Sequence, residues 1–189
     1  MAALTSTLVP LGTPAPDFAL PDVYGERYSL SLFDTAVLVV FFSCNHCPYV
    51  RHIENQLCTF VPSRDLSIVA ICPNDVERYP DDAPAKLAEQ AKRAGWRFPY
   101  LVDADQKVAR AYGAVCTPDF FVYGPDRKLA YRGAFDDSTP GNGVPVTGAA
   151  LRRAIDLIAA GRPVPEPHRP SMGCSIKWLP GNEPEAKSA

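Results

Sequence analysis

Two cysteines separated by two residues carry the strongest chemical signal in this sequence. They belong to the tetrad Cys44-Asn45-His46-Cys47, which follows an apolar run and precedes a segment of helical character. The free N–H groups and the dipole at a helix N-terminus favour an anion, so a thiol placed there has a lowered pKa. Because the thiolate is the nucleophile in disulfide exchange, the tetrad predicts a redox centre. We expect Cys44, as the more exposed cysteine, to attack and Cys47 to resolve.

The spacing of the tetrad also suits a disulfide. If the helix begins here, Cys44 and Cys47 lie three residues apart on its first turn, where side chains are neighbours. His46, as a cation or a hydrogen-bond donor, would stabilise the Cys44 thiolate and hence the reduced form. We therefore expect a potential less negative than the value of about −270 mV for thioredoxin, towards about −180 to −120 mV.

Metal binding and an inert, structural cysteine pair are the alternatives to redox chemistry. A structural zinc ion needs four ligands, and no second close pair of cysteines or histidines exists, since Cys116 and Cys174 stand alone. The sequence therefore predicts no bound metal and no other cofactor. A metal chaperone that binds copper or zinc through Cys44, Cys47 and His46 remains as an alternative.

Thr117-Pro118, just before a predicted strand, is the second feature of interest. A proline that heads a strand can be a functional cis-proline or an ordinary trans residue at a sheet edge. If Pro118 packs on the tetrad, Cys116 lies close to it and is either a third redox thiol or a small buried hydrophobe. Cys174, in a proline-flanked tail, could fold back to resolve or store oxidation, or could simply pack the tail down.

Two further cysteines are predicted to be structural. Cys58 lies eleven positions after Cys47, about 16 Å along a helix, which is too far for a disulfide. We expect Cys58 and Cys72 to lie in the core.

The elements that must position these residues alternate between strands and helices. The continuous apolar run 37–42 is typical of a strand buried on both faces. The other predicted strands are 17–20, 27–30, 66–72, 99–102, 120–123 and 129–132, and the predicted helices are 49–60, 84–94, 106–112 and 148–160. Alternating strands and helices followed by an antiparallel pair predict an α/β fold with a mixed central sheet.

Length and composition agree with one soluble domain. The chain has 189 residues and a net charge of −2, which indicates neither a nucleic-acid partner nor a membrane surface. It contains no apolar run long enough to span a bilayer and no secretory signal at its start, so we expect a cytoplasmic protein. We predict a domain over 1–162 and a proline-rich extension over 163–189 that packs on it.

The motifs together resemble the thioredoxin superfamily. A strand, Cys-x-x-Cys-Pro and a helix are followed by Thr-Pro, a hairpin and a last helix. The opening APDFALP (15–21) is similar to the alkyl-hydroperoxide-reductase/thiol-specific-antioxidant and TlpA/ResA branch. Four segments resemble a peroxiredoxin-like redoxin subfamily, whose members are described as thioredoxin-family or thiol–disulfide isomerase proteins: CNHCPYV (44–50), AVCTPDFF (114–121), YRG (131–133) and GCSIKW (173–178).

This resemblance implies a fold, a reaction and partners. The fold would be a thioredoxin-like three-layer sandwich with a central mixed sheet, an N-terminal hairpin and an extended C-terminal tail. Cys44 and Cys47 would be the redox pair, with a cis-Pro118 packed against them and the Thr117 backbone available to pair with an extended substrate. The partners would be a disulfide-bearing protein or small thiol substrate and an electron-donating reductase.

The sequence departs from the family patterns at several positions. Ser43 stands where thioredoxin has tryptophan, and the run 37–42 lacks the buried aspartate that assists proton transfer in thioredoxin. The peroxiredoxin signature Pro-x-x-x-Thr-x-x-Cys is absent, because Cys44 replaces its threonine. Disulfide exchange is therefore the leading prediction, and a peroxiredoxin-like antioxidant peroxidase is the alternative.

Overall fold

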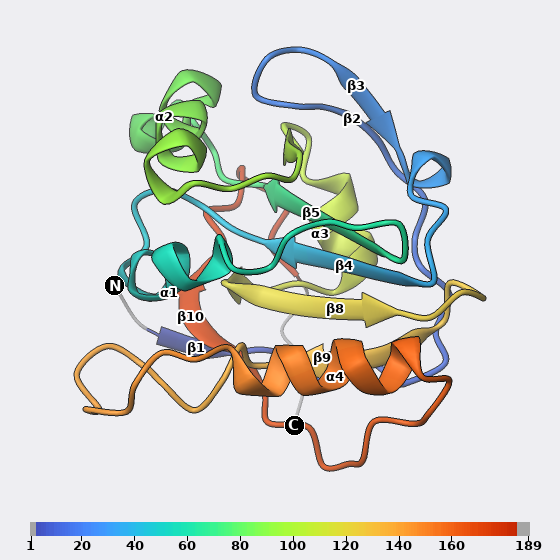
Figure 1. The fold of residues 1–189 in the computed structure, drawn as a ribbon. Coiled ribbons are helices and arrows are strands. Elements are labelled where there is room, and N and C mark those ends of the chain that lie inside the picture. Colours follow the sequence, from blue (N-terminus) through green and yellow to red (C-terminus); the bar gives the residue numbers. More distant parts are fainter. Residues whose placement is uncertain (1–2, 185–189) are drawn as a thin grey trace.

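A five-stranded mixed sheet forms the centre of the molecule (Figure 1). The computed structural model describes residues 3–184. The strand order is β6-β5-β4-β8-β9, in which β4, β5 and β6 are parallel and β8 and β9 are antiparallel to their neighbours. The strands are β4 (Val37–Phe42), β5 (Leu66–Cys72), β6 (Tyr100–Val102), β8 (Asp119–Tyr123) and β9 (Leu129–Gly133). The predicted mixed sheet is confirmed.

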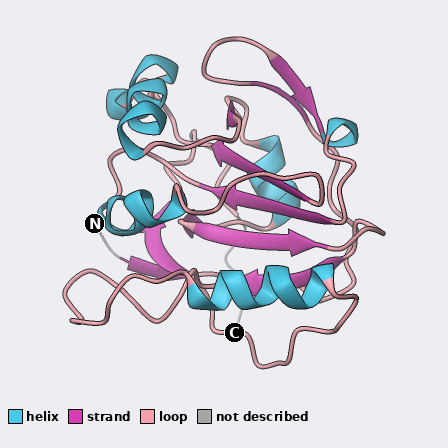
Figure 2. Cartoon of the chain, viewed as in Figure 1, coloured by secondary structure: helices cyan, strands magenta, loops and turns pink. Residues whose placement is uncertain are grey.

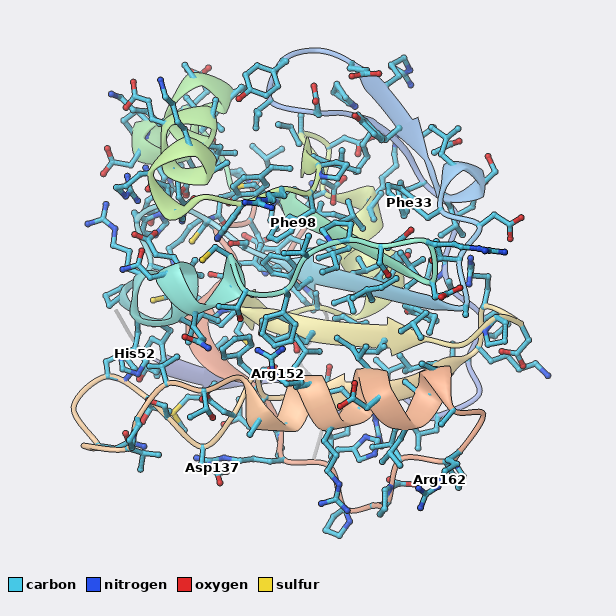
Figure 3. The ribbon with its side chains drawn as sticks, viewed as in Figure 1. Phe33, His52, Phe98, Asp137, Arg152 and Arg162 are labelled. Atoms are coloured by element: carbon cyan, nitrogen blue, oxygen red, sulfur yellow. The ribbon has the colours of Figure 1, made fainter. Side chains whose placement is uncertain are left out.

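Helices cover both faces of this sheet and make three layers (Figure 2). One face packs against α1 (Pro48–Leu57), α2 (Pro84–Ala94) and α4 (Ala149–Ala159), and the other against α3 (Lys107–Tyr112). Successive side chains of a strand point to opposite faces, so alternate residues of β4 enter two separate hydrophobic clusters. Phe98 and Phe33, labelled in Figure 3, belong to the first and the second cluster, respectively.

The N-terminal region forms the predicted hairpin. Strands β2 (Ala19–Pro21) and β3 (Arg27–Ser29) pair antiparallel. The Asp22 carboxylate closes the connection by accepting hydrogen bonds from the backbone N–H groups of Tyr24 and Glu26. A short 3-10 helix, Leu30–Leu32, follows the hairpin, and a second one, Pro80–Asp82, precedes α2.

The structure contains a second, three-stranded sheet that the sequence analysis did not predict. It has the order β1-β10-β7, with β1 (Ala3–Thr5), β10 (Met172–Ser175) and β7 (Cys116–Thr117), and all of its pairs are antiparallel. These strands are too short to give a periodic signal, and they pair the two ends of the chain with its middle. The sheet brings the C-terminal tail beside α1, as Figure 1 shows.

Buried polar side chains hold this tail against the domain. The Gln106 amide donates to the Lys177 carbonyl at 2.9 Å, and the Asn74 side-chain oxygen accepts from the Lys177 N–H at 2.8 Å. Ile176 lies in the second hydrophobic cluster, and its N–H donates to the Val115 carbonyl at 3.0 Å. The tail is thus tied to the domain by both hydrogen bonds and apolar packing.

The observed helices differ from the predicted ones mainly at the ends of α1. This helix begins at Pro48, after the tetrad, and ends at Leu57. Cys58 therefore follows the last helical turn and is half-buried, which corrects its predicted place in the core, whereas Cys72 is buried as expected. Across residues 3–184, no helix is both long enough and apolar enough to cross a membrane.

Candidate redox site

The tetrad lies where β4 passes into α1. Cys44 is in the connecting loop and Cys47 is the N-cap residue of α1. Both cysteines have 0% of their surface exposed. Two expectations are therefore wrong: Cys44 is not on the first helical turn, and it is not the more exposed thiol. The first helical residue is a proline, which suits a first turn because its missing N–H has no helical partner there.

Thr117 contacts both thiols from the opposite side. The Thr117–Pro118 peptide bond is cis, as predicted. The Thr117 hydroxyl lies 3.2 Å from Cys44 Sγ, and its carbonyl oxygen lies 3.2 Å from Cys47 Sγ, where the thiol form of Cys47 can donate to it. The cis-proline loop therefore packs directly on the cysteine pair.

The two thiols differ in acidity because their surroundings differ. The hydrogen bond from Cys44 lowers the pKa of Cys47 to about 5, against the effect of burial, and the Cys174 thiol and the Val50 N–H act in the same direction. Burial, that same hydrogen bond and the nearby Asp82 charge raise the pKa of Cys44. The surroundings therefore favour the charged form of Cys47 over that of Cys44. The surroundings do not favour the Cys44 thiolate that the sequence analysis expected.

Asp82, at the end of the second 3-10 helix, is a site residue that the sequence analysis missed. Its fully buried carboxylate accepts hydrogen bonds from the Asn45 N–H at 2.7 Å, His46 Nδ1 at 2.6 Å and the Asn74 amide at 2.8 Å. Although burial opposes ionisation, the bonds from His46 and Asn74 hold the pKa of Asp82 below its usual range. His46 therefore partners Asp82 rather than a thiolate. No motif in the sequence marks Asp82.

Cys44, His46 and Asp82 also form a group of potential metal ligands. One ligand atom from each lies within 4.8 Å of the others. His46 Nδ1 hydrogen-bonds to the Asp82 carboxylate, whereas His46 Nε2 is buried without a hydrogen-bond partner among the described residues. The metal-chaperone alternative named Cys47 as a ligand, whereas Asp82 takes that place in this group.

A network between α1 and α2 fixes the backbone of the tetrad. The Gln90 amide donates to the Cys44 carbonyl at 3.2 Å, and Arg51 Nε donates to the Asn45 carbonyl at 2.7 Å. Arg93 bridges the Asn45 side chain and the Glu54 carboxylate, at 3.3 and 3.0 Å. These contacts hold the loop at the end of β4 without engaging either sulfur.

The remaining predicted thiols have different surroundings. Cys174 lies on β10, opposite Thr117, and belongs to the same buried cluster as Cys44 and Cys47. Cys116 is buried, and its sulfur faces the Pro118 carbonyl at 3.9 Å instead of the tetrad. Burial raises the pKa of the Cys116 thiol. Of these two candidates, the fold brings Cys174 into contact with the redox pair.

The Thr117 backbone is not available to a substrate, contrary to what the resemblance implied. It pairs with Cys174 across β7 and β10. The strands approach so closely that a Cβ added at Gly173 would lie 1.9 Å from the Thr117 carbonyl oxygen. Glycine is therefore required at position 173 for this tail to reach the cis-proline loop.

The three-layer fold, the cysteine pair at a helix N-terminus and the cis-proline packed on it define a thioredoxin-like oxidoreductase. Solved thioredoxin-family domains of low sequence identity share this fold. Residues 11–132 match the AhpC/TSA family, and the chain belongs to that family.

Three similar proteins illustrate this relationship. The solved structure of an uncharacterised conserved protein from Geobacillus kaustophilus is 47% identical, with a TM-score of 0.92 over 96% of this chain and 98% of that one. A candidate peroxiredoxin of Mycobacterium tuberculosis is 33% identical over 58% of this chain and 67% of its own length. The thiol–disulfide oxidoreductase ResA of Geobacillus thermodenitrificans is 25% identical over 65% of this chain and 68% of its own length.

Proposed function

We propose that this oxidoreductase exchanges electrons with disulfide-bearing substrates through Cys44 and Cys47. The observation that carries the proposal is a buried cysteine pair at the start of α1 whose two sulfurs contact the cis-proline loop, in surroundings that lower the pKa of Cys47. A thiolate at neutral pH is the species that attacks a disulfide. The similarity to ResA, a thiol–disulfide oxidoreductase by name, supports the same reaction.

The surroundings of the two thiols suggest the order of steps. The Cys47 thiolate attacks a substrate disulfide, which forms a Cys47–substrate bond and releases one substrate sulfur as a thiolate. Cys44 then loses its proton and attacks Cys47 Sγ, so that the second substrate sulfur leaves and a Cys44–Cys47 disulfide remains. The substrate gains two electrons and two protons, and a reductase or a small thiol restores the pair. Relative to the sequence prediction, the attacking and the resolving cysteine exchange roles.

Trapping of the mixed disulfide tests this order. Cys44→Ser should accumulate a substrate disulfide at Cys47, whereas Cys47→Ser should lose insulin reduction and trap nothing. Cys58→Ser, at the half-buried end of α1, serves as the control and should reduce insulin like the wild type. Trapping by Cys47→Ser instead would return the attacking role to Cys44, and full activity in both tetrad variants would refute the redox pair.

A thiol peroxidase is the second candidate, and the burial of the pair favours it. Neither sulfur is exposed, and a peroxide needs far less space to reach Cys47 than a protein disulfide does. Attack of the thiolate on a peroxide forms a sulfenic acid, which Cys44 can resolve as a disulfide. Stopped-flow measurement of peroxide consumption decides between the two, since a rate no faster than that of a free thiol excludes the peroxidase.

A further inference from the structure

The C-terminal strand β10 takes the place at Thr117 that an extended substrate would occupy. Thr117 pairs with Cys174, and Cys116 pairs with Ser175, in antiparallel register. On its other edge β10 pairs with β1, so it is held between two strands. Gly173 permits the close approach, because any side chain there would collide with the Thr117 carbonyl. The tail therefore packs closely against β7, and this contact requires glycine at position 173.

This pairing delivers a third thiol to the redox pair. Cys174 is 3% exposed and lies in one buried cluster with Cys44 and Cys47. It pairs with Thr117, whose hydroxyl and carbonyl contact the sulfurs of Cys44 and Cys47. The three cysteines come from the β4–α1 loop, the start of α1 and β10. A substrate cysteine carried on an extended segment would arrive in a comparable position.

We propose that β10 acts as a built-in substrate strand and that Cys174 exchanges disulfides with the Cys44–Cys47 pair. The inference rests on the proposed function, which supplies the Cys44–Cys47 disulfide. Cys174 loses its proton and attacks Cys47 Sγ, so that a Cys47–Cys174 bond forms and the Cys44–Cys47 bond breaks. Cys44 leaves as a thiolate and takes up a proton. One disulfide is exchanged for another, so the step needs no further oxidant.

Electrostatics supports exchange in the oxidised protein. Burial, the hydrogen bond to Cys47 and the charge on Cys47 together raise the pKa of Cys174 to about 12 in the reduced cluster. Formation of the Cys44–Cys47 disulfide removes the Cys47 charge, while the cation of Lys177 continues to favour a Cys174 thiolate. Cys174 therefore becomes a better nucleophile when there is a disulfide for it to attack.

Two consequences distinguish this arrangement from a tail that only packs. The Cys47–Cys174 bond would tether the tail over the tetrad and release Cys44 as a free thiol. A protein substrate could pair with Thr117 only after β10 leaves that edge. The tail would then regulate access and hold the two-electron oxidation of the redox pair as a Cys47–Cys174 disulfide.

Disulfide mapping of the full chain tests the proposal. The wild type is oxidised stepwise with diamide, alkylated and digested with trypsin without reduction. Cleavage at lysine and arginine, except before proline, places Cys44 and Cys47 in peptide 28–51 and Cys174 in peptide 154–177. We expect the two peptides to be joined in part of the oxidised protein. A wild type that forms the Cys44–Cys47 disulfide but never joins these peptides overturns the proposal.

Variants identify the sulfurs and separate the two hypotheses. Cys44→Ser should still join the two peptides, Cys44→Ser/Cys174→Ser should lose the link, and the matched Cys44→Ser/Cys116→Ser should retain it. A thermal melt like that of the wild type shows that each variant is folded. Cys174→Ser alone, with Cys44 and Cys47 intact, should also lose the link between the two peptides. Insulin reduction without the link defeats only this inference, whereas absence of both the reduction and the Cys44–Cys47 disulfide defeats the proposed function.

Discussion

Cys47 receives stabilising contacts from two residues three positions away and from one on a distant strand. The thiols of Cys44 and Cys174 and the backbone N–H of Val50 all lower its pKa. Each donor favours the charged form, and together they outweigh the cost of burial. The acidity of this thiol therefore depends first on the Cys-x-x-Cys spacing and the start of α1, and the distant strand β10 adds to it.

The pH dependence of alkylation tests this assignment. Cys47 should react with iodoacetamide with a midpoint near pH 5, because its thiolate forms there. In Cys44→Ala the midpoint should rise, because the largest stabilising hydrogen bond is removed. The measurement is the initial rate from pH 4 to 9 with the modified peptide identified by mass spectrometry. A midpoint near the usual thiol value in the wild type would contradict the assignment.

Asp82 should contribute to stability through the loop that carries Asn45 and His46. Asp82→Asn removes the negative charge and one of the two oxygens that accept from these residues, and we expect it to cost about 1–3 kcal/mol of unfolding free energy. Because the pKa of Asp82 is depressed in the folded state, this contribution is present at neutral pH and is lost as the pH falls through that pKa.

Urea unfolding at pH 7 and at acid pH measures both the cost and its pH dependence. Asp81→Asn is the matched control, because Asp81 is next to Asp82 in the sequence and is exposed. Equal stability of the two variants at pH 7 would refute the role of Asp82.

At the scale of elements, the site depends on three connections. The β4–α1 loop supplies the cysteines, the β7–β8 junction supplies the cis-proline loop, and β10 covers both. The first two connections can be recognised in the sequence, one as a buried strand that runs into a proline-led helix and the other as a proline that heads a strand. The third exists only because two short strands pair across most of the length of the chain.

Gly173→Ala should separate β10 from the cis-proline loop. The added Cβ would lie 1.9 Å from a backbone oxygen, so the strand must shift. If the shift costs about 1.4 kcal/mol of strand pairing, Cys47 should alkylate about tenfold faster at pH 7. Gly124→Ala is the control, because a Cβ there meets only ordinary contacts, the nearest at 3.4 Å. Unchanged alkylation in Gly173→Ala would mean that β10 does not protect the site.

At the scale of the whole molecule, the two ends of the chain meet beside the central sheet. Asp119, the first residue of β8, is buried against Ser6 near the N-terminus and Ser171 near the C-terminus, and these two serines hydrogen-bond to each other. Burial raises the pKa of Asp119 to about 8, and the Ser171 hydroxyl donates to the Gly133 carbonyl. This junction therefore binds a proton in the folded state that the unfolded chain releases near pH 4.

The stability of the whole fold should reflect that proton. A carboxyl whose pKa is raised by folding loses its contribution as the pH rises from about 4 to about 8. Asp119→Asn should therefore become progressively more stable than the wild type over this range, because the amide cannot ionise. Urea unfolding across the range measures the difference, with the exposed Asp65→Asn as control. A difference that does not change with pH would show that Asp119 ionises normally.

Local signals in the sequence determined the order of the elements and the class of chemistry. The apolar run 37–42, the tetrad after it and Thr117-Pro118 each depend on neighbouring residues, so they could be recognised without a structure. Asp82, the β1-β10-β7 sheet and the contact between Cys174 and Cys47 could not, because they join residues separated by many positions and carry no periodic pattern. Burial of both cysteines was likewise decided by the tertiary structure, since desolvation arises only when distant segments pack together.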